Sequence, residues 1–398
     1  MSGMHFARAM VHGIRCAAAA SVGVGLALAA CAHTPAAANA VAPSGPTSLK
    51  DAFRGAFTIG VAVNAAQFSG RDTLGVRLIE QQFNAISPEN ALKWESVHPR
   101  LGEYTFAAAD QYVAFGEAHH MFILGHNLVW HNQVPRWVFQ SADGAPVSRD
   151  TLLARMRDHI FTVVGRYKGR INAWDVVNEA LNEDGTLRQS PWLRIIGPDY
   201  IVKAFQFAHE ADPGAELYYN DYSLENTPKR NGAVKLVRDL LAQGIPIAGI
   251  GLQGHDKLNW PTAEQEDSTI SAFAALGIKV NISELDVDVL PAAVRGPTAD
   301  ISARGAMRPA VNPYPDGLPD SVQTALTRQY RDLFGVFLRH RAQMERVTFW
   351  GATDADSWLN NWPVPGRTSY PLLFDRQGRP KPAFDAIVRE ARAVLSPT

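Results

Sequence analysis

Cysteine is almost absent from this sequence of 398 residues, and both cysteines, Cys16 and Cys31, lie near its beginning. The rest of the chain can therefore form no internal disulfide and no metal site with cysteine ligands. An excess of charge of one sign is also lacking, because 38 Lys and Arg residues face 39 Asp and Glu residues. A near-neutral chain gives no indication of a nucleic-acid partner, and none is expected.

The motifs that bind common cofactors are missing as well. The chain has no phosphate-binding loop, no Gly-x-Gly-x-x-Gly after its first predicted strand and no His-x-His pair. We therefore expect neither a cofactor nor a metal. A metal site built from His126, His131 and His255 is an alternative, but it would leave Asn178 and Gln253 without a role.

Acidic residues are absent from positions 1–50, where Arg8 and Arg15 precede an apolar run from Cys16 to Ala30. This pattern is typical of an export signal, which we place at residues 1–30. The run is shorter than the roughly 20 residues that a membrane-spanning helix needs. A permanent transmembrane helix is therefore the weaker interpretation.

Two cleavage sites compete after this signal. Residues 28–31 read Leu-Ala-Ala-Cys, which is similar to the lipobox of bacterial lipoproteins, whereas residues 38–40 have the small-x-small form of ordinary secretory cleavage. We favour the first, since it follows the apolar run directly. The protein is then expected to be exported and tethered to a membrane through a lipid on Cys31, and otherwise to be periplasmic or secreted. Residues 31–48, rich in Ala and Pro, are predicted to form a flexible tether.

Residues 49–395 are predicted to form a single domain, in which short apolar runs alternate with amphipathic stretches. The stretch from Ser321 to His340, for example, repeats apolar residues at helical spacing. Eight runs are predicted to be strands: Phe57–Val63, Phe83–Pro88, Phe122–Trp130, Ile171–Ala180, Glu216–Asp221, Ala248–His255, Lys279–Asp286 and Arg346–Gly351. This alternation predicts an α/β fold of the (β/α)8 TIM barrel type, with an open doubly wound sheet as the alternative. We expect a monomer.

Polar and aromatic side chains stand at the carboxyl ends of the predicted strands. In a (β/α)8 barrel these ends meet on one face, where active sites are built. The strand-end residues are Glu89, Asn90, Lys93, His126, Trp130, Asn178, Glu179, Asn220, Gln253, His255, Glu284, Asp286 and Trp350. Trp350 and Trp358 also offer flat faces on which a sugar ring can lie. The pattern therefore predicts a site for a polar, ring-shaped substrate.

Two of these residues, Glu179 and Glu284, follow well-separated strands and are expected to face each other across the barrel mouth. Opposed carboxyl groups suit glycoside hydrolysis, in which one is a proton donor and the other attacks the sugar or activates water. The charge of one carboxylate raises the pKa of the other and keeps an acid available near neutral pH. Spacing along the sequence leaves the stereochemical outcome open.

Five strand-end segments resemble glycoside hydrolase family 10, the endo-1,4-β-xylanases, and the likeness runs from about residue 49 to 395. The segments are Ser87–Trp94 (Ser-Pro-Glu-Asn-Ala-Leu-Lys-Trp), Gly125–His131, Trp174–Glu179 (Trp-Asp-Val-Val-Asn-Glu), Gly251–His255 and Ile282–Asp286 (Ile-Ser-Glu-Leu-Asp). Their order along the chain and their places at strand ends make the resemblance specific.

The resemblance implies a retaining double displacement in xylan or xylo-oligosaccharides, with Glu179 as acid/base and Glu284 as nucleophile. Asn178 matches the residue that bonds the 2-hydroxyl of the sugar being cleaved, and His255, held by Asp286, matches the residue that orients the nucleophile. Further matches to substrate contacts are His126, Gln253, Glu89, Asn90, Lys93, Trp358, Trp130 and Trp350, while Asn220 is expected to support the barrel mouth. The alternatives are other β-1,4-glycans as substrates or a non-catalytic glycan-binding lipoprotein.

A long proline-rich stretch, from Val287 to Asp320, follows the nucleophile strand. Loops of this length are usually functional or mobile. We hypothesise that it covers the leaving-group side of the cleft and favours branched over plain chains.

Overall fold

The computed structural model describes residues 48–294, 301 and 304–395. The predicted export signal and nearly all of the predicted tether lie outside these residues. No helix among the described residues is long and apolar enough to cross a membrane.

Eight parallel strands close into a barrel. They are β1 (Thr58–Val63), β2 (Ala85–Pro88), β3 (Phe122–Val129), β4 (Ala173–Asn178), β5 (Glu216–Asp221), β6 (Gly249–Leu252), β8 (Lys279–Asp288) and β9 (Met344–Phe349). Each pairs in parallel with the next along the chain; β6 pairs with β8, and β9 pairs with β1 and so closes the ring. The predicted (β/α)8 barrel is confirmed, and closure excludes the open doubly wound sheet.

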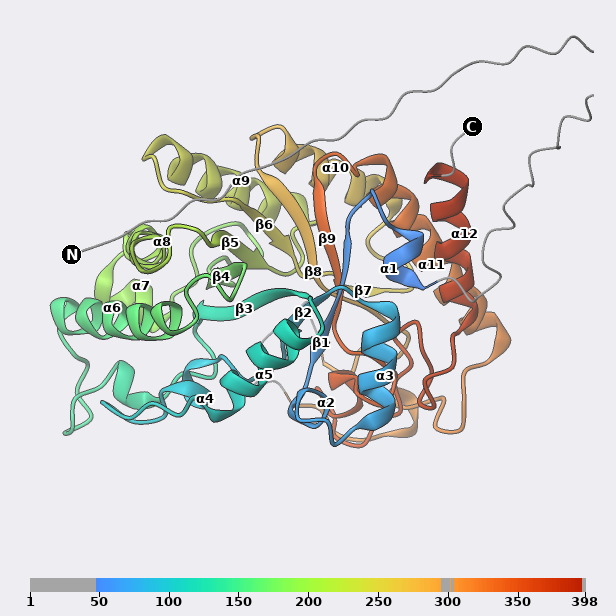
Figure 1. Cartoon of the computed structure of the whole chain (residues 1–398), viewed down its shortest axis with the longest axis horizontal. Coiled ribbons are helices and arrows are strands. Elements are labelled where there is room, and N and C mark those ends of the chain that lie inside the picture. The colour runs from blue at the N-terminus through green and yellow to red at the C-terminus, as the bar shows by residue number, and fades with distance from the viewer. Residues whose placement is uncertain (1–47, 295–300, 302–303, 396–398) are drawn as a thin grey trace, which may run out of the picture. The chain divides into compact units, whose positions relative to one another are not determined.

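Helices surround the strands, as Figure 1 shows. The longer ones are α3 (Thr73–Gln82), α5 (Ala107–Ala118), α6 (Arg149–Arg166), α8 (Tyr200–Ala211), α9 (Thr227–Ala242), α10 (Ala263–Ala274), α11 (Asp320–Arg339) and α12 (Pro382–Leu395), and the shorter ones are α1 (Leu49–Ala52), α2 (Ala65–Phe68), α4 (Trp94–Val97) and α7 (Pro191–Ile196). Polar residues fix several starts: Ser148 caps α6 and Thr262 forms a capping box on α10. In α11 the predicted apolar face is buried at Leu326, Leu333 and Phe334.

The strands carry apolar side chains on both faces, since one face fills the barrel and the other receives the helices. Close packing explains one glycine of the sequence motifs. Gly125 on β3 lies against the ring of Trp174 on β4, so a Cβ at this position would overlap the indole. The glycine therefore permits a buried tryptophan between neighbouring strands.

One predicted strand is interrupted. The run Ala248–His255 forms β6 only as far as Leu252, and the chain resumes as a short strand, β7 (His255–Lys257). Gly254 lies between them with φ of +75°, a conformation that glycine adopts without strain. The break sets β7 beside the outer end of β8, with His255 opposite Asp286.

Candidate active site

Glu179 directly follows β4, with φ of +55°, in a conformation that is strained for a residue other than glycine. Three hydrogen bonds hold its backbone there. The Glu179 N–H donates to the Asn220 carbonyl at 2.9 Å, the Ala180 N–H donates to the Tyr219 hydroxyl at 3.1 Å, and Arg188 Nε donates to the Glu179 carbonyl at 3.1 Å. These contacts turn the side chain into the barrel mouth.

The carboxyl group of Glu179 is buried and accepts three hydrogen bonds from side chains, one of them from Asn178 Nδ2 at 3.2 Å. Trp130 Nε1 donates to Oε2 at 2.8 Å, and Gln253 Nε2 donates to Oε1 at 3.0 Å. Burial raises the pKa of Glu179 to about 7, and the charges of Asp221 and Glu284 act in the same direction, against the hydrogen bonds from Gln253 and Trp130. Glu179 can therefore carry a proton near neutral pH.

Glu284 lies inside β8 and not at its end, because pairing with β7 extends this strand to Asp288. His255 Nε2 is 3.2 Å from Oε2, and Asn220 Nδ2 donates to Oε1 at 2.8 Å. Burial alone would raise the pKa of Glu284, but the hydrogen bond from His255, the charges of His126 and His255 and the hydrogen bond from Asn220 together outweigh it and hold the pKa below its ordinary value. Glu284 is therefore ionised under conditions in which Glu179 is protonated.

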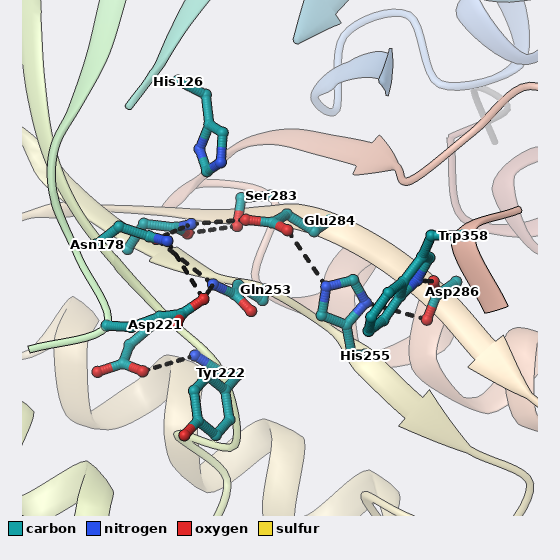
Figure 2. Close-up of polar contacts among 12 residues, drawn as sticks. His126, Asn178, Asp221, Tyr222, Gln253, His255, Ser283, Glu284, Asp286 and Trp358 are labelled. Atoms are coloured by element: carbon teal, nitrogen blue, oxygen red, sulfur yellow. Dashed lines mark hydrogen bonds and ion pairs between the residues drawn. The ribbon is translucent and has the colours of Figure 1, made fainter. Parts of the chain in front are cut away.

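His255 forms the link between Glu284 and a third carboxylate. Its Nδ1 is 3.1 Å from Asp286 Oδ1, and Trp358 Nε1 donates to the other oxygen of Asp286 at 2.7 Å. Burial opposes a charged ring, but the two carboxylates outweigh it and raise the pKa of His255 to about 10. Figure 2 shows His255 between Glu284 on one side and Asp286 and Trp358 on the other.

Amide side chains join the two glutamates. Asn220 Nδ2 donates to Asn178 Oδ1 at 2.9 Å as well as to Glu284, and Asn178 Nδ2 donates to Glu179 Oε1 at 3.2 Å. The Ser283 hydroxyl donates to Asn220 Oδ1 at 2.6 Å and fixes the orientation of this amide. The glutamates thus belong to one hydrogen-bonded network, of which Figure 2 labels Asn178, Ser283 and Glu284.

A second polar group follows β2. Lys93 Nζ donates to Asn90 Oδ1 at 3.2 Å and to Gln133 Oε1 at 2.7 Å, and it lies 5.1 Å from the centre of the Trp130 ring. Burial lowers the pKa of Lys93 and raises that of Glu89. These groups line the same cavity as the glutamates and present donors and acceptors to it.

The structure brings the predicted residues together around one cavity of about 150 Å³. Its lining contains every residue predicted to act on or bind the substrate: Glu89, Asn90, Lys93, His126, Trp130, Asn178, Glu179, Gln253, His255, Glu284, Trp350 and Trp358. The two predicted supporting residues lie directly behind, Asp286 against His255 and Asn220 against Glu284. Gln133 and Ile301 complete the lining.

Several residues of the site were not predicted from the sequence. Asp175 Oδ2 is 2.9 Å from His126 Nδ1, and Arg188 and Tyr219 hold the backbone around Glu179. Asp175 lies opposite His126 in the β3–β4 register, a signal that requires the register to be known. Gln133 and Arg188 lie in loops, where sequence spacing predicts no contacts.

The alternative of a three-histidine metal site fits this geometry poorly. Both ring nitrogens of His255 face carboxylates, Nδ1 that of Asp286 and Nε2 that of Glu284, and His131 Nε2 is 3.1 Å from the side-chain amide of Asn132. No group of three or more His, Cys, Asp or Glu side chains in the described part of the chain is arranged to hold a metal ion.

A closed (β/α)8 barrel with two buried carboxyl groups in its mouth, whose pKa values are shifted in opposite directions, is the arrangement that a glycoside hydrolase needs. The family model of glycosyl hydrolase family 10 matches residues 48–390, and the chain belongs to this family.

Known relatives cover most of the chain. It is 45% identical over 350 residues to endo-1,4-beta-xylanase A of Xylanibacter ruminicola, which covers 88% of this chain and 95% of the relative. It is 40% identical to the endo-1,4-beta-xylanase of Geobacillus stearothermophilus, over 86% of this chain and 98% of that protein. Among solved structures, a GH10 endoxylanase from a sugarcane soil metagenome matches 87% of this chain and 100% of its own, with a TM-score of 0.82 and 45% identity.

Proposed function

We propose that the protein is a retaining endo-1,4-β-xylanase that cleaves internal bonds of xylan by double displacement. The observation that carries this proposal is the opposite shift of two carboxyl groups in one cavity, with the pKa of Glu179 raised to about 7 and that of Glu284 lowered. Such a pair supplies an acid and a nucleophile at the same pH.

In the first step an oxygen of Glu284 attacks the anomeric carbon while Glu179 donates its proton to the departing glycosidic oxygen. The bond to the leaving chain breaks and a covalent glycosyl-enzyme forms. In the second step Glu179, now ionised, takes a proton from water as the water attacks the same carbon. Glu284 is released and the product keeps the original anomeric configuration.

We assign the contacts of the cleaved sugar to Asn178, His126 and Gln253, and those of the next sugar to Glu89, Asn90, Lys93 and Trp358. All of them line the cavity that holds the two glutamates. Trp130 and Trp350 wall the cavity, where a hydroxymethyl group at C5 would collide with an indole. This wall favours xylose over glucose by exclusion.

Azide separates the two catalytic roles in an experiment with an activated aryl β-xylobioside. In Glu284→Ala, activity is expected to vanish, and azide then attacks from the vacated face and gives an α-glycosyl azide. In Glu179→Ala the glycosyl-enzyme still forms, and azide gives a β-glycosyl azide. The opposite assignment of configurations, or unchanged activity in Glu284→Ala, contradicts these roles. Wild-type enzyme that binds xylo-oligosaccharides but releases no product supports the non-catalytic alternative.

We further propose that the protein is exported and tethered through a lipid on Cys31. The basis is the Leu-Ala-Ala-Cys sequence directly after the apolar run. Intact-mass analysis of the exported protein is the test, and an unmodified N-terminus at Val41 contradicts the proposal.

A further inference from the structure

A buried ion pair lies close to the turn that carries Glu179. It joins Asp221, the last residue of β5, to Lys229 on α9, with Oδ1 and Nζ 3.0 Å apart and both side chains 0% exposed. Neither residue lines the cavity of the two glutamates, which we call the reaction cavity. Burial of two charges costs free energy that an apolar pair of the same size would not cost, so stability is a poor explanation for this pair.

Asp221 is held by more than this cation. Its Oδ1 also accepts the Tyr222 N–H at 2.9 Å, as Figure 2 shows, and its Oδ2 accepts the hydroxyl of Tyr219. Lys229 Nζ is also 3.1 Å from Glu183 Oε1 and lies 3.3 Å from the centre of the Tyr222 ring. Burial would lower the pKa of Lys229, but the charges around it, above all that of Asp221, outweigh burial and raise the pKa. Lys229 therefore stays a cation and fixes the carboxylate of Asp221.

Tyr219 connects Asp221 to the strained turn. Its hydroxyl has one hydrogen, which it donates to Asp221, and its lone pairs are then free to accept the Ala180 N–H at 3.1 Å. This N–H belongs to the peptide bond that directly follows Glu179, whose φ is +55°. Asp221 thus sets the direction of the Tyr219 hydroxyl, and the hydroxyl in turn holds the backbone of the proposed acid/base.

Asp221 also acts on Glu179 through its charge. Burial is the largest cause of the raised pKa of Glu179, and among the charges that of Asp221 contributes more than that of Glu284. Glu284 becomes an ester in the glycosyl-enzyme and loses its charge, whereas Asp221 takes no part in bond formation. In the second step Asp221 therefore still favours protonation of Glu179, which must then take a proton from water.

Further titratable groups surround these two carboxyl groups. Those that face Glu179 or Asp221, besides the residues named above, are Lys93, Arg188, Tyr200, Tyr222 and Glu225. Glu225 titrates in the same range as Glu179, because burial raises its pKa to about 7. A variant at Glu225 therefore provides the control for any change in the pH profile.

We propose that Asp221 is a positioning residue for the acid/base: it holds the Glu179–Ala180 peptide bond through the Tyr219 hydroxyl and places a fixed negative charge near the carboxyl group of Glu179. This inference rests on the proposed function, in which Glu179 delivers a proton to the leaving group. Lys229 keeps the carboxylate of Asp221 in place. The effect of Asp221 should therefore be largest where the leaving group needs a proton.

The test uses two substrates that differ in their need for a proton. The leaving group of xylohexaose must be protonated, whereas that of dinitrophenyl β-xylobioside departs without a proton. In Asp221→Asn, kcat/KM on xylohexaose is expected to fall about tenfold, a part of the roughly 10²- to 10⁴-fold that a general acid contributes, and kcat/KM on the aryl substrate should change less than about twofold. The alkaline limb of kcat/KM on xylohexaose should move down by about one pH unit, because a charge that favours protonated Glu179 is lost.

Three further variants separate the charge, the hydroxyl and the fold. The double variant Asp221→Asn, Lys229→Met leaves no unpaired buried charge, so its fold is expected to be intact, and it should show the same changes as Asp221→Asn. Tyr219→Phe removes the hydroxyl and keeps the charge, so kcat/KM on xylohexaose should fall while the alkaline limb stays in place. Glu225→Gln is the matched control, in which neither quantity should change.

Equal losses on the two substrates in the double variant would show a structural role only and overturn the inference. An alkaline limb that stays in place in both Asp221 variants overturns it as well, as does an equal movement of the limb in Glu225→Gln. A wild type that hydrolyses neither substrate contradicts the proposed function itself, so the two failures are distinguishable.

Discussion

Two of the buried clusters among the described residues contain histidine whose pKa is shifted in opposite directions. In the active site His255 lies between the carboxylates of Glu284 and Asp286, and its pKa is raised to about 10. Behind the site His98 and His159 lie in an aromatic stack, with their Nδ1 atoms 3.3 Å apart. Burial lowers the pKa of His98 to about 4 and that of His159 well below its ordinary value.

Desolvation disfavours the charged ring in both clusters. The groups around each ring therefore determine whether the pKa of the histidine rises or falls. The stack offers only rings: His159 lies on Trp94 with centres 3.6 Å apart, and His98 lies on Tyr104 with centres 3.8 Å apart. Among the described residues no carboxylate is hydrogen-bonded to either ring; that of Asp158 accepts a hydrogen bond from the Tyr104 hydroxyl at 2.9 Å instead. The stack therefore supplies packing, while the active-site cluster supplies a charge that keeps Glu284 ionised.

The largest effect is expected from removal of the charge of Asp286, which should abolish the difference in pKa between the two kinds of histidine. In Asp286→Asn the pKa of His255 should fall, because the negative charge that favours its cation is gone. The pKa of Glu284 should then rise, and the acid limb of kcat/KM should move to higher pH. We expect kcat/KM to drop on the order of 10²- to 10⁴-fold, as when the carboxylate behind a catalytic histidine is replaced. A pH profile of kcat/KM measures both effects.

A histidine–carboxylate pair outside the site serves as the control for this experiment. His340 Nε2 is 3.0 Å from Asp267 Oδ1, near the surface. Asp267→Asn should leave kcat/KM and its pH limbs unchanged. An acid limb that stays in place in Asp286→Asn would show that His255 does not set the ionisation of Glu284.

A smaller effect is expected from a substitution beside Glu179, the other carboxyl group of the pair. Trp130→Phe keeps a ring in the wall but removes the Nε1–H that donates to Glu179 at 2.8 Å. This hydrogen bond favours the ionised form, so its loss should raise the pKa of Glu179 above about 7. The alkaline limb of kcat/KM should move up by about one pH unit. Movement in the other direction would contradict the assignment of Glu179 as the acid.

The sequence was sufficient for the barrel and for most of the lining of the reaction cavity, Gln133 and Ile301 excepted, since both follow from local patterns. Strand runs end in polar residues, and parallel closure brings those ends to one face. Contacts between elements mostly escaped prediction; the exception is His255, predicted to be held by Asp286, whose Nδ1 is 3.1 Å from Asp286 Oδ1. Asp175 behind His126 requires the register of two strands. His98 and His159, 61 positions apart in the chain, meet only through tertiary packing, and no spacing rule places them beside Trp94.

The aromatic stack also belongs to the active site, although it carries no charge. Trp94 Nε1 donates to the carbonyl of Leu128, and Trp192 Nε1 donates to the carbonyl of Trp130 at 2.7 Å. Both acceptors lie at the carboxyl end of β3 or directly after it, where Trp130 turns toward Glu179. The aromatic stack thus positions Trp130, whose Nε1–H donates a hydrogen bond to Glu179.

The smallest expected effect comes from a substitution in the aromatic stack, and it is an effect on stability and not on the catalytic rate. The pKa of each ring is lower in the folded chain than in the unfolded chain. As the pH falls from about 6.5 toward 4, the unfolded chain therefore binds protons that the folded chain does not bind. Stability should therefore decrease with acidification across this window. His159→Phe keeps a ring on Trp94 but removes one titrating group, so the decrease in its unfolding free energy between pH 7 and 4.5 should be shallower than in wild type by about 2 kcal/mol. Urea unfolding at the two pH values measures the difference, and His209→Phe on α8 is the control. If His159→Phe loses as much unfolding free energy between the two pH values as wild type, the ring of His159 already takes up its proton in the folded protein.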